Sequence, residues 1–400
     1  SGKTIVALLS MLMAIDNGFQ ACIMAPTEIL AQQHFTTISK ELAEMDINVN
    51  ILTGSKKTKA RRELLEELEN GKIQLLIGTH ALLEDKVKFH NLGFVVIDEQ
   101  HRFGVAQRAK LWKKNKFPPH ILVMTATPIP RTLSMTLYGD LDVSVIDELP
   151  PGRKVIKTLW RSDSSRLKII RFMREQIKVG RQIYVVFPLI DESAKMDYKN
   201  LIEGYDSIVR EFPLPEFQVS VVHGQMKSED KEYEMNRFVE GVTDIMVATT
   251  VIEVGVNVPN ASAMIIESAE RFGLSQLHQL RGRVGRGSNQ SYCILMSGNK
   301  LSNDAKTRLK TLVDTNDGFE IAEVDLKLRG PGDMMGTKQS GILDFKIADI
   351  IKDNKILLYA RKEVDQLLLD DFELSKSENI NIARFYRPYA RERMGWSRIS

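Results

Sequence analysis

The sequence is poor in cysteine and contains no long hydrophobic run. Two cysteines in 400 residues are too few for a disulfide framework. Cys22 and Cys293 each lie in an apolar stretch typical of a buried strand, so we interpret them as core residues in a reducing compartment. No apolar segment reaches the ~18 residues that a membrane span requires, and a signal-peptide pattern is missing. These absences predict a cytoplasmic protein without a membrane partner.

Metal-ligand spacing and a strong net charge are also missing. The seven histidines follow no metal-binding pattern. The 55 Lys and Arg residues almost balance the 52 Asp and Glu residues, which leaves a net charge of +3. A binding site for a polyanion must therefore be a local patch. The length of 400 residues, with 43% hydrophobic residues, predicts two or three globular domains.

What the sequence does contain is an alternation of short β-branched strands and amphipathic helices, which is typical of parallel α/β units. A Pro-Pro-Gly run at residues 150–152 predicts a linker between two such units, because it suits neither a helix nor a central strand. The expected strands are Ala21–Met24, Val49–Leu52, Gln74–Ile77, Phe94–Ile97 and Ile121–Met124 before the linker, then Val155–Leu159, Ile183–Phe187, Val219–Val222, Ile245–Ala248, Ala263–Ile266 and Tyr292–Met296.

The strands cease near residue 300, and helices follow. We expect a first lobe at residues 1–149, a second at 150–300, a helical hairpin and loop at 301–345 and a C-terminal helix with a basic tail at 346–400. For one helix of the second lobe the sequence contains both a start and a stop signal. Ser162 or Asp163 is expected to cap it, and Gly180 to stop it in the left-handed conformation. Its predicted core face consists of Leu167, Ile170, Met173 and Ile177.

The chain opens with Ser1, Gly2, Lys3 and Thr4 before a helical stretch. This matches the second half of the phosphate-binding loop G-x-x-x-x-G-K-[ST]. In such a loop Ser1 and Gly2 bring backbone N–H groups to the phosphates, Lys3 reaches the β and γ phosphates, and the Thr4 hydroxyl binds Mg²⁺. The alternative is an ordinary capped helix start.

A carboxylate pair follows the apolar strand at residues 94–97. Asp98 and Glu99 stand where a parallel sheet places its ligand chemistry, at the carboxyl end of a buried strand. Asp98 fits a Mg²⁺ ligand, and Glu99 fits the group that orients or activates the attacking water. Together with Lys3, the pair predicts hydrolysis of ATP with Mg²⁺.

The box that begins at Asp98 and seven further blocks stand in order along the chain and resemble superfamily 2 helicases. The run Asp98–His101 resembles the DExH box, and residues 279–286, QLRGRVGR, match the pattern Q-x-x-G-R-x-G-R in full. The other blocks are residues 25–33, 78–82, 125–131, 185–190, 222–226 and 247–255. The resemblance implies two RecA-like parallel-sheet lobes in tandem that close on ATP. It makes Gln279, Arg283 and Arg286 catalytic and places Gly255 at the nucleotide.

Guanidinium is the side chain suited to a developing phosphoryl charge, because it is planar and permanently charged. We expect Arg283 and Arg286 to act on the γ-phosphate from the second lobe. The alternative is a solvated basic turn. In the same block as Gly255, Asn257 stands where the family often has aspartate, and asparagine can still accept a hydrogen bond from a ribose hydroxyl.

Threonines at strand ends are expected to hold DNA phosphates without reading bases. They are Thr27, Thr79, Thr249 and Thr250, and Thr127 is also assigned to DNA binding or coupling. The alternative for each strand-end threonine is an ordinary turn residue. His101 is expected to couple the magnesium site to the block at residues 125–131. The remaining histidines and the tryptophans are interpreted as packing or surface residues: His34, His90, His120, His278, Trp112, Trp160 and Trp396.

Several stretches extend the resemblance to the RecG family of branch-migration helicases and its relative, the transcription-repair coupling factor. Residues 98–105, DEQHRFGV, and 127–133, TPIPRTL, carry it first. Residues 317–326 with Arg329-Gly330-Pro331-Gly332 and residues 336–341 then resemble the TRG translocation motif, a helical hairpin and loop. This implies that Arg329 and Gln339 couple ATP turnover to movement on duplex DNA. The implied substrates are stalled forks and Holliday junctions in DNA repair and recombination, and the implied state is a monomer.

The resemblance also implies an upstream wedge domain that engages the junction, and a first sheet that lacks an interior strand here. We therefore expect these 400 residues alone to bind ATP poorly and to unwind no fork. Three alternatives stay open: a transcription-repair coupling factor, a DEAD-box RNA helicase and a non-hydrolysing ATP-gated DNA clamp. The coupling factor more usually has Asp-Glu-Glu in the box, and a clamp does not need Glu99, Arg283 and Arg286 together.

Overall fold

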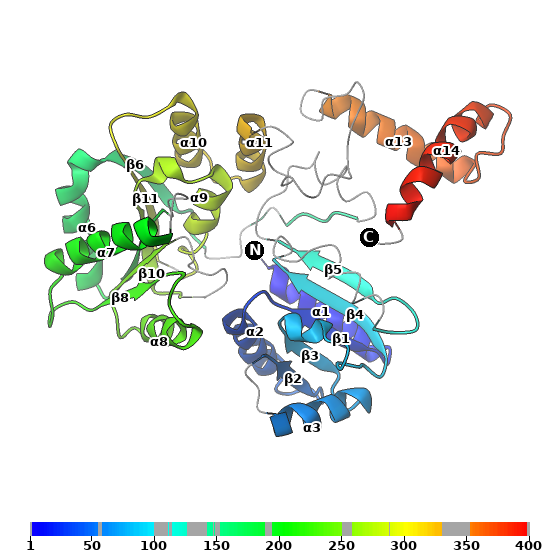
Figure 1. Cartoon of the computed structure of the whole chain (residues 1–400), viewed down its shortest axis with the longest axis horizontal. Coiled ribbons are helices and arrows are strands. Elements are labelled where there is room, and N and C mark those ends of the chain that lie inside the picture. The colour runs from blue at the N-terminus through cyan, green and yellow to red at the C-terminus, as the bar shows by residue number, and fades with distance from the viewer. Residues whose placement is uncertain are drawn as a thin grey trace. The chain divides into compact units, whose positions relative to one another are not determined.

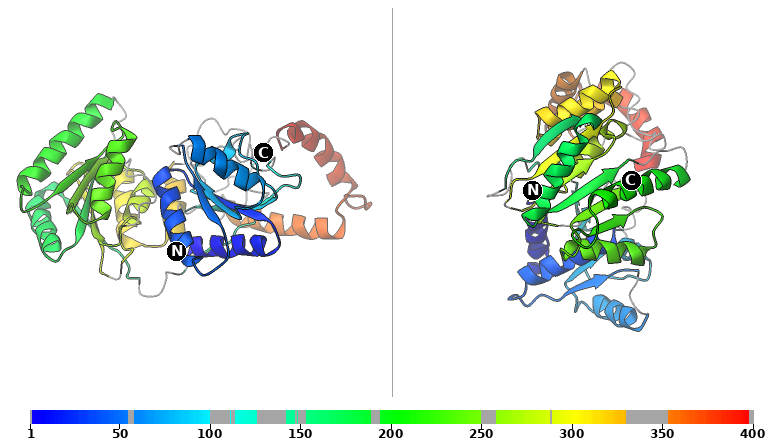
Figure 2. Two further views of the ribbon diagram at one scale, coloured as in Figure 1. Left: turned by 90° about the horizontal axis from the view of Figure 1, so that it is seen from below. Right: turned by 90° about the vertical axis from the view of Figure 1, so that its left-hand side faces the viewer.

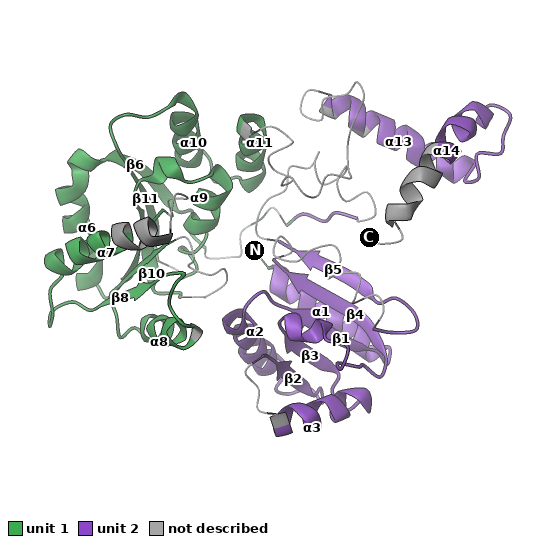
Figure 3. Cartoon of the chain, viewed as in Figure 1, with its two compact units in different colours: residues 1–2, 126–128, 146–328 green, residues 3–125, 129–145, 329–400 purple. Residues whose placement is uncertain are grey.

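The computed structural model describes residues 2–54, 58–99, 111, 114–125, 142–146, 148, 153–188, 194–249, 258–287, 289–329 and 353–397. The chain divides into two compact units, each with its own parallel sheet (Figures 1 and 3). We call Lys3–Thr125 the first lobe and Ile146–Leu328 the second lobe. Helices α13 (Asn354–Asp370) and α14 (Ile380–Ser397) belong to the same unit as the first lobe.

The sheet of the first lobe has the strand order β2-β3-β1-β4-β5, and every neighbouring pair is parallel. Its central strands are buried on both sides, which explains their continuous rather than alternating apolar sequence. The strands are β1 (Gln20–Met24), β2 (Val49–Leu52), β3 (Leu75–Gly78), β4 (Leu92–Asp98) and β5 (His120–Met124).

Helices cover both faces of this sheet. One face packs on α1 (Lys3–Asp16) and α2 (Glu28–Glu41), in a core that includes Met11, Ile38 and Val96. The other face packs on α3 (Thr58–Glu69) and the short turn η1 (His80–Leu83). The three layers hold the carboxyl ends of the strands at one edge.

The sheet of the second lobe has the order β6-β11-β10-β7-β9-β8, again with every neighbouring pair parallel. One face packs on α6 (Arg166–Lys178) and α7 (Ala194–Glu211). On the other, Phe238 of α8 (Ser228–Val239) packs against Tyr184 with ring centroids 4.8 Å apart. Figure 2 gives two further views of these layers. The strands are β6 (Lys157–Ser162), β7 (Gln182–Phe187), β8 (Val219–Val222), β9 (Ile245–Thr249), β10 (Ala261–Ile266) and β11 (Tyr292–Ser297).

Three helices end the second lobe: α9 (Leu274–Arg281), α10 (Asn303–Asp314) and α11 (Gly318–Arg329). Arg281 joins α9 to the end of α10, because its guanidinium donates to the carbonyl oxygens of Leu312 at 2.8 Å and Thr315 at 2.9 Å. Ser275 of α9 donates to Asp325 of α11 at 2.6 Å. These three helices therefore form one bonded group.

Every expected strand is present, and β6 departs most in its bounds, starting at Lys157 rather than Val155. Both cysteines are buried, and burial raises the pKa of each thiol to about 12, as expected of core residues. The five described strands of the first sheet pair consecutively, and the expectation that an upstream strand completes this sheet stays a prediction. The linker at residues 150–152 lies outside the described residues.

The start and the face of α6 differ from the prediction. Neither Ser162 nor Asp163 caps it; a short turn, η3 (Asp163–Ser165), comes first, and Ser162 bonds to Ser164 instead. Of the predicted core face, Met173 is buried, and Ile170 and Ile177 pack against the same core, as expected. Leu167 is 78% exposed, and Ile169 is buried instead. Leu167 and Ile169 lie about 200° apart around a helix, so they cannot share a face. Gly180 has a φ of 74°, as predicted for the stop.

Candidate active site

Lys3 is the first residue of α1, and the helix is held against the sheet by its buried residues Ala7, Leu8 and Met11. Gly2 and Thr4 flank the lysine and are partly buried. The first backbone N–H groups of a helix have no partner within the helix, so its amino end attracts an anion. Ser1 lies outside the described residues.

Asp98 ends β4, the neighbour of β1 in the sheet. Its side chain is 13% exposed and is held by two hydrogen bonds. One carboxylate oxygen, Oδ1, accepts from the backbone N–H of Glu99 at 3.0 Å, and the other, Oδ2, lies 3.0 Å from Nε2 of His34. The carboxylate is therefore fixed in rotation at the carboxyl edge of the sheet.

Glu99 is buried and has a φ of 54°, in the left-handed region that residues other than glycine rarely adopt. Such backbone strain is concentrated at functional sites, where the surrounding structure holds it in place. Two successive acids thus stand at the carboxyl end of one strand, the second of them in this strained conformation.

A magnesium ion would fit this group of residues only together with phosphate oxygens. Asp98 and the Thr4 hydroxyl are ligands of the kind that Mg²⁺ takes alongside a nucleotide. Within the described part of the chain, no cluster of three His, Cys, Asp or Glu residues could hold a metal by itself. The donor set therefore suits a metal that arrives with a phosphate.

In the second lobe, Gln279 lies on α9, and Arg283 and Arg286 follow the helix directly. Arg283 is 7% exposed, which is unusual for an arginine. Both guanidinium groups lie near Tyr184 of β7: burial raises the pKa of this tyrosine, and the charges of Arg286 and Arg283 oppose the rise. Arg283 is thus buried and Arg286 half-buried, and both carry their charge close enough to Tyr184 to act on its pKa.

The predicted DNA-contacting threonines stand at strand ends. Thr27 and Thr79 follow β1 and β3, which are parallel neighbours, so both lie at the same edge as Asp98. Thr27 also caps α2, because its Oγ1 accepts from the N–H of Leu30 at 3.3 Å. Its hydroxyl hydrogen can still be donated to a phosphate. Thr249 ends β9, and its buried hydroxyl has no hydrogen-bond partner among the described residues.

Several predicted site residues lie outside the described residues: His101, Thr127, Thr250, Gly255 and Gln339. Arg329 is the last residue of α11. Sequence reasoning missed His34, which was interpreted as a packing residue. The missed signal is its place on α2, four residues after Leu30 and four before Ile38, which are both buried.

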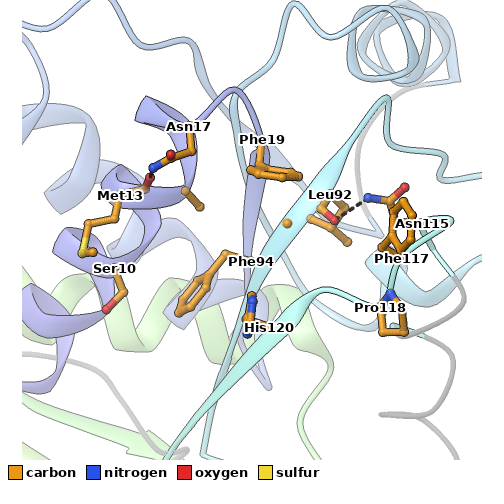
Figure 4. Close-up of a pocket in the computed structure, with 12 residues that line it drawn as sticks. Ser10, Met13, Asn17, Phe19, Leu92, Phe94, Asn115, Phe117, Pro118 and His120 are labelled. Atoms are coloured by element: carbon orange, nitrogen blue, oxygen red, sulfur yellow. Dashed lines mark hydrogen bonds between the residues drawn. The ribbon is translucent and has the colours of Figure 1, made fainter.

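A separate hollow of about 540 Å³ lies at the other end of the first sheet (Figure 4). It is lined by Met13 of α1, by Phe94 of β4 and by Phe117, and the amide of Asn115 at its rim donates to the carbonyl of Leu92 at 2.7 Å. The residues around Asp98 do not line it, so it is not part of the candidate site.

The two parallel sheets and the order of the motifs define a class: a superfamily 2 helicase motor with two RecA-like lobes. Family models agree along the chain. The DEAD/DEAH box helicase model matches residues 1–136, the helicase conserved C-terminal domain matches 166–288, and the C-terminal part of domain 3 of the ATP-dependent DNA helicase RecG matches 315–400. The chain belongs to the RecG family of helicases.

Individual relatives support this assignment. The ATP-dependent DNA helicase RecG of Synechocystis is 51% identical over 96% of this chain and 46% of its own length. The solved structure of RecG bound to a three-way DNA junction has a TM-score of 0.73 and 43% identity, covering 89% of this chain and 46% of that one. Yeast Dbp5 bound to RNA, at 17% identity and a TM-score of 0.58 over 82% of this chain and 86% of its own, shares the fold. This chain spans about half the length of the curated relatives it matches.

Proposed function

We propose that the protein is an ATP-driven double-stranded-DNA translocase that remodels stalled replication forks and Holliday junctions in DNA repair and recombination. One observation carries the proposal. Lys3 starts α1, the helix that packs on β4. Asp98 ends β4, and Glu99 directly follows it. A lysine at a helix start and a carboxylate pair at a strand end are the parts that bind and hydrolyse ATP in this class of motor.

Each group has a role in the proposed reaction. Gly2 and the amino end of α1 would hold the phosphates, Lys3 would neutralise the β and γ phosphates, and Thr4 and Asp98 would hold Mg²⁺. When bound, the metal neutralises charge on the phosphate oxygens. Glu99 would orient the attacking water and accept its proton.

Gln279, Arg283 and Arg286 are the second lobe's proposed contribution. The two guanidinium groups would stabilise the charge that develops on the γ-phosphoryl group, and Gly255 would contact the nucleotide. Because these groups belong to a different lobe from Lys3, ATP would favour closure of the motor and hydrolysis would release it. The proximity of both arginines to Tyr184 supports their acting together.

Duplex DNA is the proposed track. Thr27, Thr79, Thr127 and Thr249 would contact phosphates without reading sequence, as a translocase requires. His101, Arg329 and Gln339 would couple the ATP site to movement, and the bonds from Arg281 and Ser275 connect α9 to the helices before Arg329. The relative solved on a three-way junction favours branched DNA. We further propose that the protein acts in the cytoplasm as a monomer, with a wedge domain of its own that engages the junction. No helix in the described part of the chain is long and apolar enough to cross a bilayer.

The rival functions have weaker support. The relatives favour RecG over a coupling factor, and the likeness to Dbp5 is too distant to argue for RNA. A non-hydrolysing clamp would have no use for the strained acid Glu99 beside Asp98.

ATP hydrolysis by the protein at its natural length tests the proposal on four nucleic acids: a fork, a Holliday junction, linear duplex and single-stranded RNA. We expect branched DNA to stimulate hydrolysis most and RNA not to stimulate it. Glu99→Gln should reduce turnover by about 10²-fold or more, the contribution of a general base. Equal stimulation by RNA would favour an RNA helicase, and unchanged turnover in Glu99→Gln would favour the clamp.

A further inference from the structure

His34 is a polar residue in an otherwise apolar stripe. On the face of α2 that packs against the sheet, its neighbours are Leu30, Ala31 and Ile38, all buried. The His34 side chain is 8% exposed. A polar ring in such a place costs stability unless it is hydrogen-bonded, so its partner determines what it does.

The partner is the proposed Mg²⁺ ligand. With its proton on Nε2, His34 donates to Oδ2 of Asp98 at 3.0 Å, while the backbone N–H of Glu99 donates to Oδ1. Each carboxylate oxygen has a second lone pair, so both stay able to bind a cation. Because one donor holds each oxygen, the two bonds fix the rotation of the carboxylate about its Cβ–Cγ bond.

The helix that carries His34 also carries a block expected to contact DNA. Thr27 caps the start of α2, and Glu28 in its first turn accepts from the backbone N–H of Gly54 at 2.8 Å. His34 lies nearly two turns further along the same helix. The Asp98–His34 bond thus connects the end of β4 to the helix whose other end carries Thr27.

We propose that His34 is a positioning residue for ATP binding: it fixes the Asp98 carboxylate in the orientation that takes Mg²⁺ with the nucleotide. The inference rests on the proposed function and adds to it a residue that no helicase motif in this chain required. Groups that orient a metal ligand typically contribute about 10- to 100-fold to metal affinity.

Equilibrium binding of a fluorescent, non-hydrolysable ATP analogue tests this, measured at a series of Mg²⁺ concentrations on the protein at its natural length. His34→Leu removes the donor. His34→Gln places an amide N–H near the position of Nε2, whereas His34→Asn has the same chemistry but is too short to reach it. Thr36→Ala is the matched control on the same helix, because the Thr36 hydroxyl bonds only to the carbonyl of Gln32 at 3.0 Å.

We expect the Mg²⁺ concentration for half-maximal analogue binding to rise about 10-fold or more in His34→Leu and His34→Asn. It should stay within about twofold of the unmodified protein in His34→Gln and Thr36→Ala, since both keep the Asp98 bond. If His34 had a purely structural role, its substitution would lower the thermal unfolding midpoint. The Mg²⁺ dependence of analogue binding by the molecules that remain folded would then be unchanged.

Two results would overturn the inference: a Mg²⁺ dependence in His34→Asn equal to that in His34→Gln, or one in His34→Leu equal to that in Thr36→Ala. The pair Gln and Asn decides the matter even if the leucine variant does not fold. Failure of the proposed function looks different, because then Lys3→Ala would bind the analogue as well as the unmodified protein.

Discussion

The two lobes share the order of five parallel strands. In sheet order, β2-β3-β1-β4-β5 of the first lobe corresponds to β8-β9-β7-β10-β11 of the second, which adds β6 beside β11. By this correspondence α1 matches α6 and β4 matches β10. The lobes can therefore be compared residue by residue at the ends of these elements.

The comparison is closest where the nucleotide site is expected. Lys3 starts α1 and Arg166 starts α6; Asp98 ends β4 and Glu267 directly follows β10. The next residue has a positive φ in both lobes, 54° at Glu99 and 46° at Ser268. In the second lobe the two groups bind each other, with Arg166 nitrogens at 2.9 and 2.8 Å from the two carboxylate oxygens of Glu267.

This difference explains how the same fold can form a phosphate site in the first lobe and none in the second. Arg166 and Glu267 form a bidentate ion pair, in which two guanidinium nitrogens bond to the two carboxylate oxygens. The same nitrogens would otherwise be able to bind a phosphate. In the first lobe the acid is held by His34 and a backbone N–H, which are not competing cations at the helix start. We infer that the second lobe's counterpart of the phosphate site is closed.

The largest difference between the lobes is expected when the two helix-start cations, Lys3 and Arg166, are each changed to alanine. Lys3→Ala should reduce DNA-stimulated ATP hydrolysis by about 10²-fold or more, because it removes a charge that stabilises the transferring phosphoryl group. Arg166→Ala should change hydrolysis per folded molecule by less than about twofold, since no phosphate contact is lost. Comparable losses in both variants would break the comparison.

A second shared feature predicts equal effects in the two lobes. Gln20 begins β1, and its amide donates to the carbonyls of Leu68 and Ile73; Gln182 begins β7 and donates to those of Phe238 and Thr243. Either glutamine changed to leucine leaves two buried carbonyls without this donor, which should cost about 1–3 kcal/mol of local stability.

Amide hydrogen exchange can measure both glutamine variants. Gln20→Leu should speed exchange in the first sheet and Gln182→Leu in the second, each without effect on the other sheet. Faster exchange in both sheets from a single substitution would mean that the lobes are not independent folding units.

The smallest expected effect sharpens the contrast by pH. Burial, with the nearby charge of Arg281, lowers the pKa of His278 in the second lobe from its ordinary value of 6.5 to about 4. The unfolded chain therefore binds a proton more readily than the folded one between these values, and stability falls as pH is lowered through this window. His278→Asn keeps an acceptor for Arg281 but does not titrate, so hydrogen exchange in α9 should depend less on pH. An unchanged pH profile would contradict this.

Much of the fold was readable from the sequence because buried parallel strands are continuous apolar runs, and each expected strand is present. The start of α6 was not, because Ser162 is a favourable cap in sequence and only the three-dimensional turn η3 delays the helix. The positions of Lys3 at a helix start and of Asp98 at a strand end could be predicted from the motif patterns, and the catalytic roles of Lys3, Asp98 and Glu99 stay predictions. His34 could not, because its partner Asp98 lies 64 residues away and sequence spacing says nothing about a bond across the sheet.

Nucleotide-binding stoichiometry tests the central claim most directly, measured by titrating a non-hydrolysable ATP analogue with Mg²⁺ against the protein at its natural length. We predict one analogue per chain, lost in Lys3→Ala and kept in Arg166→Ala. Two analogues per chain, or binding that survives Lys3→Ala and disappears in Arg166→Ala, would contradict the assignment of the site to the first lobe.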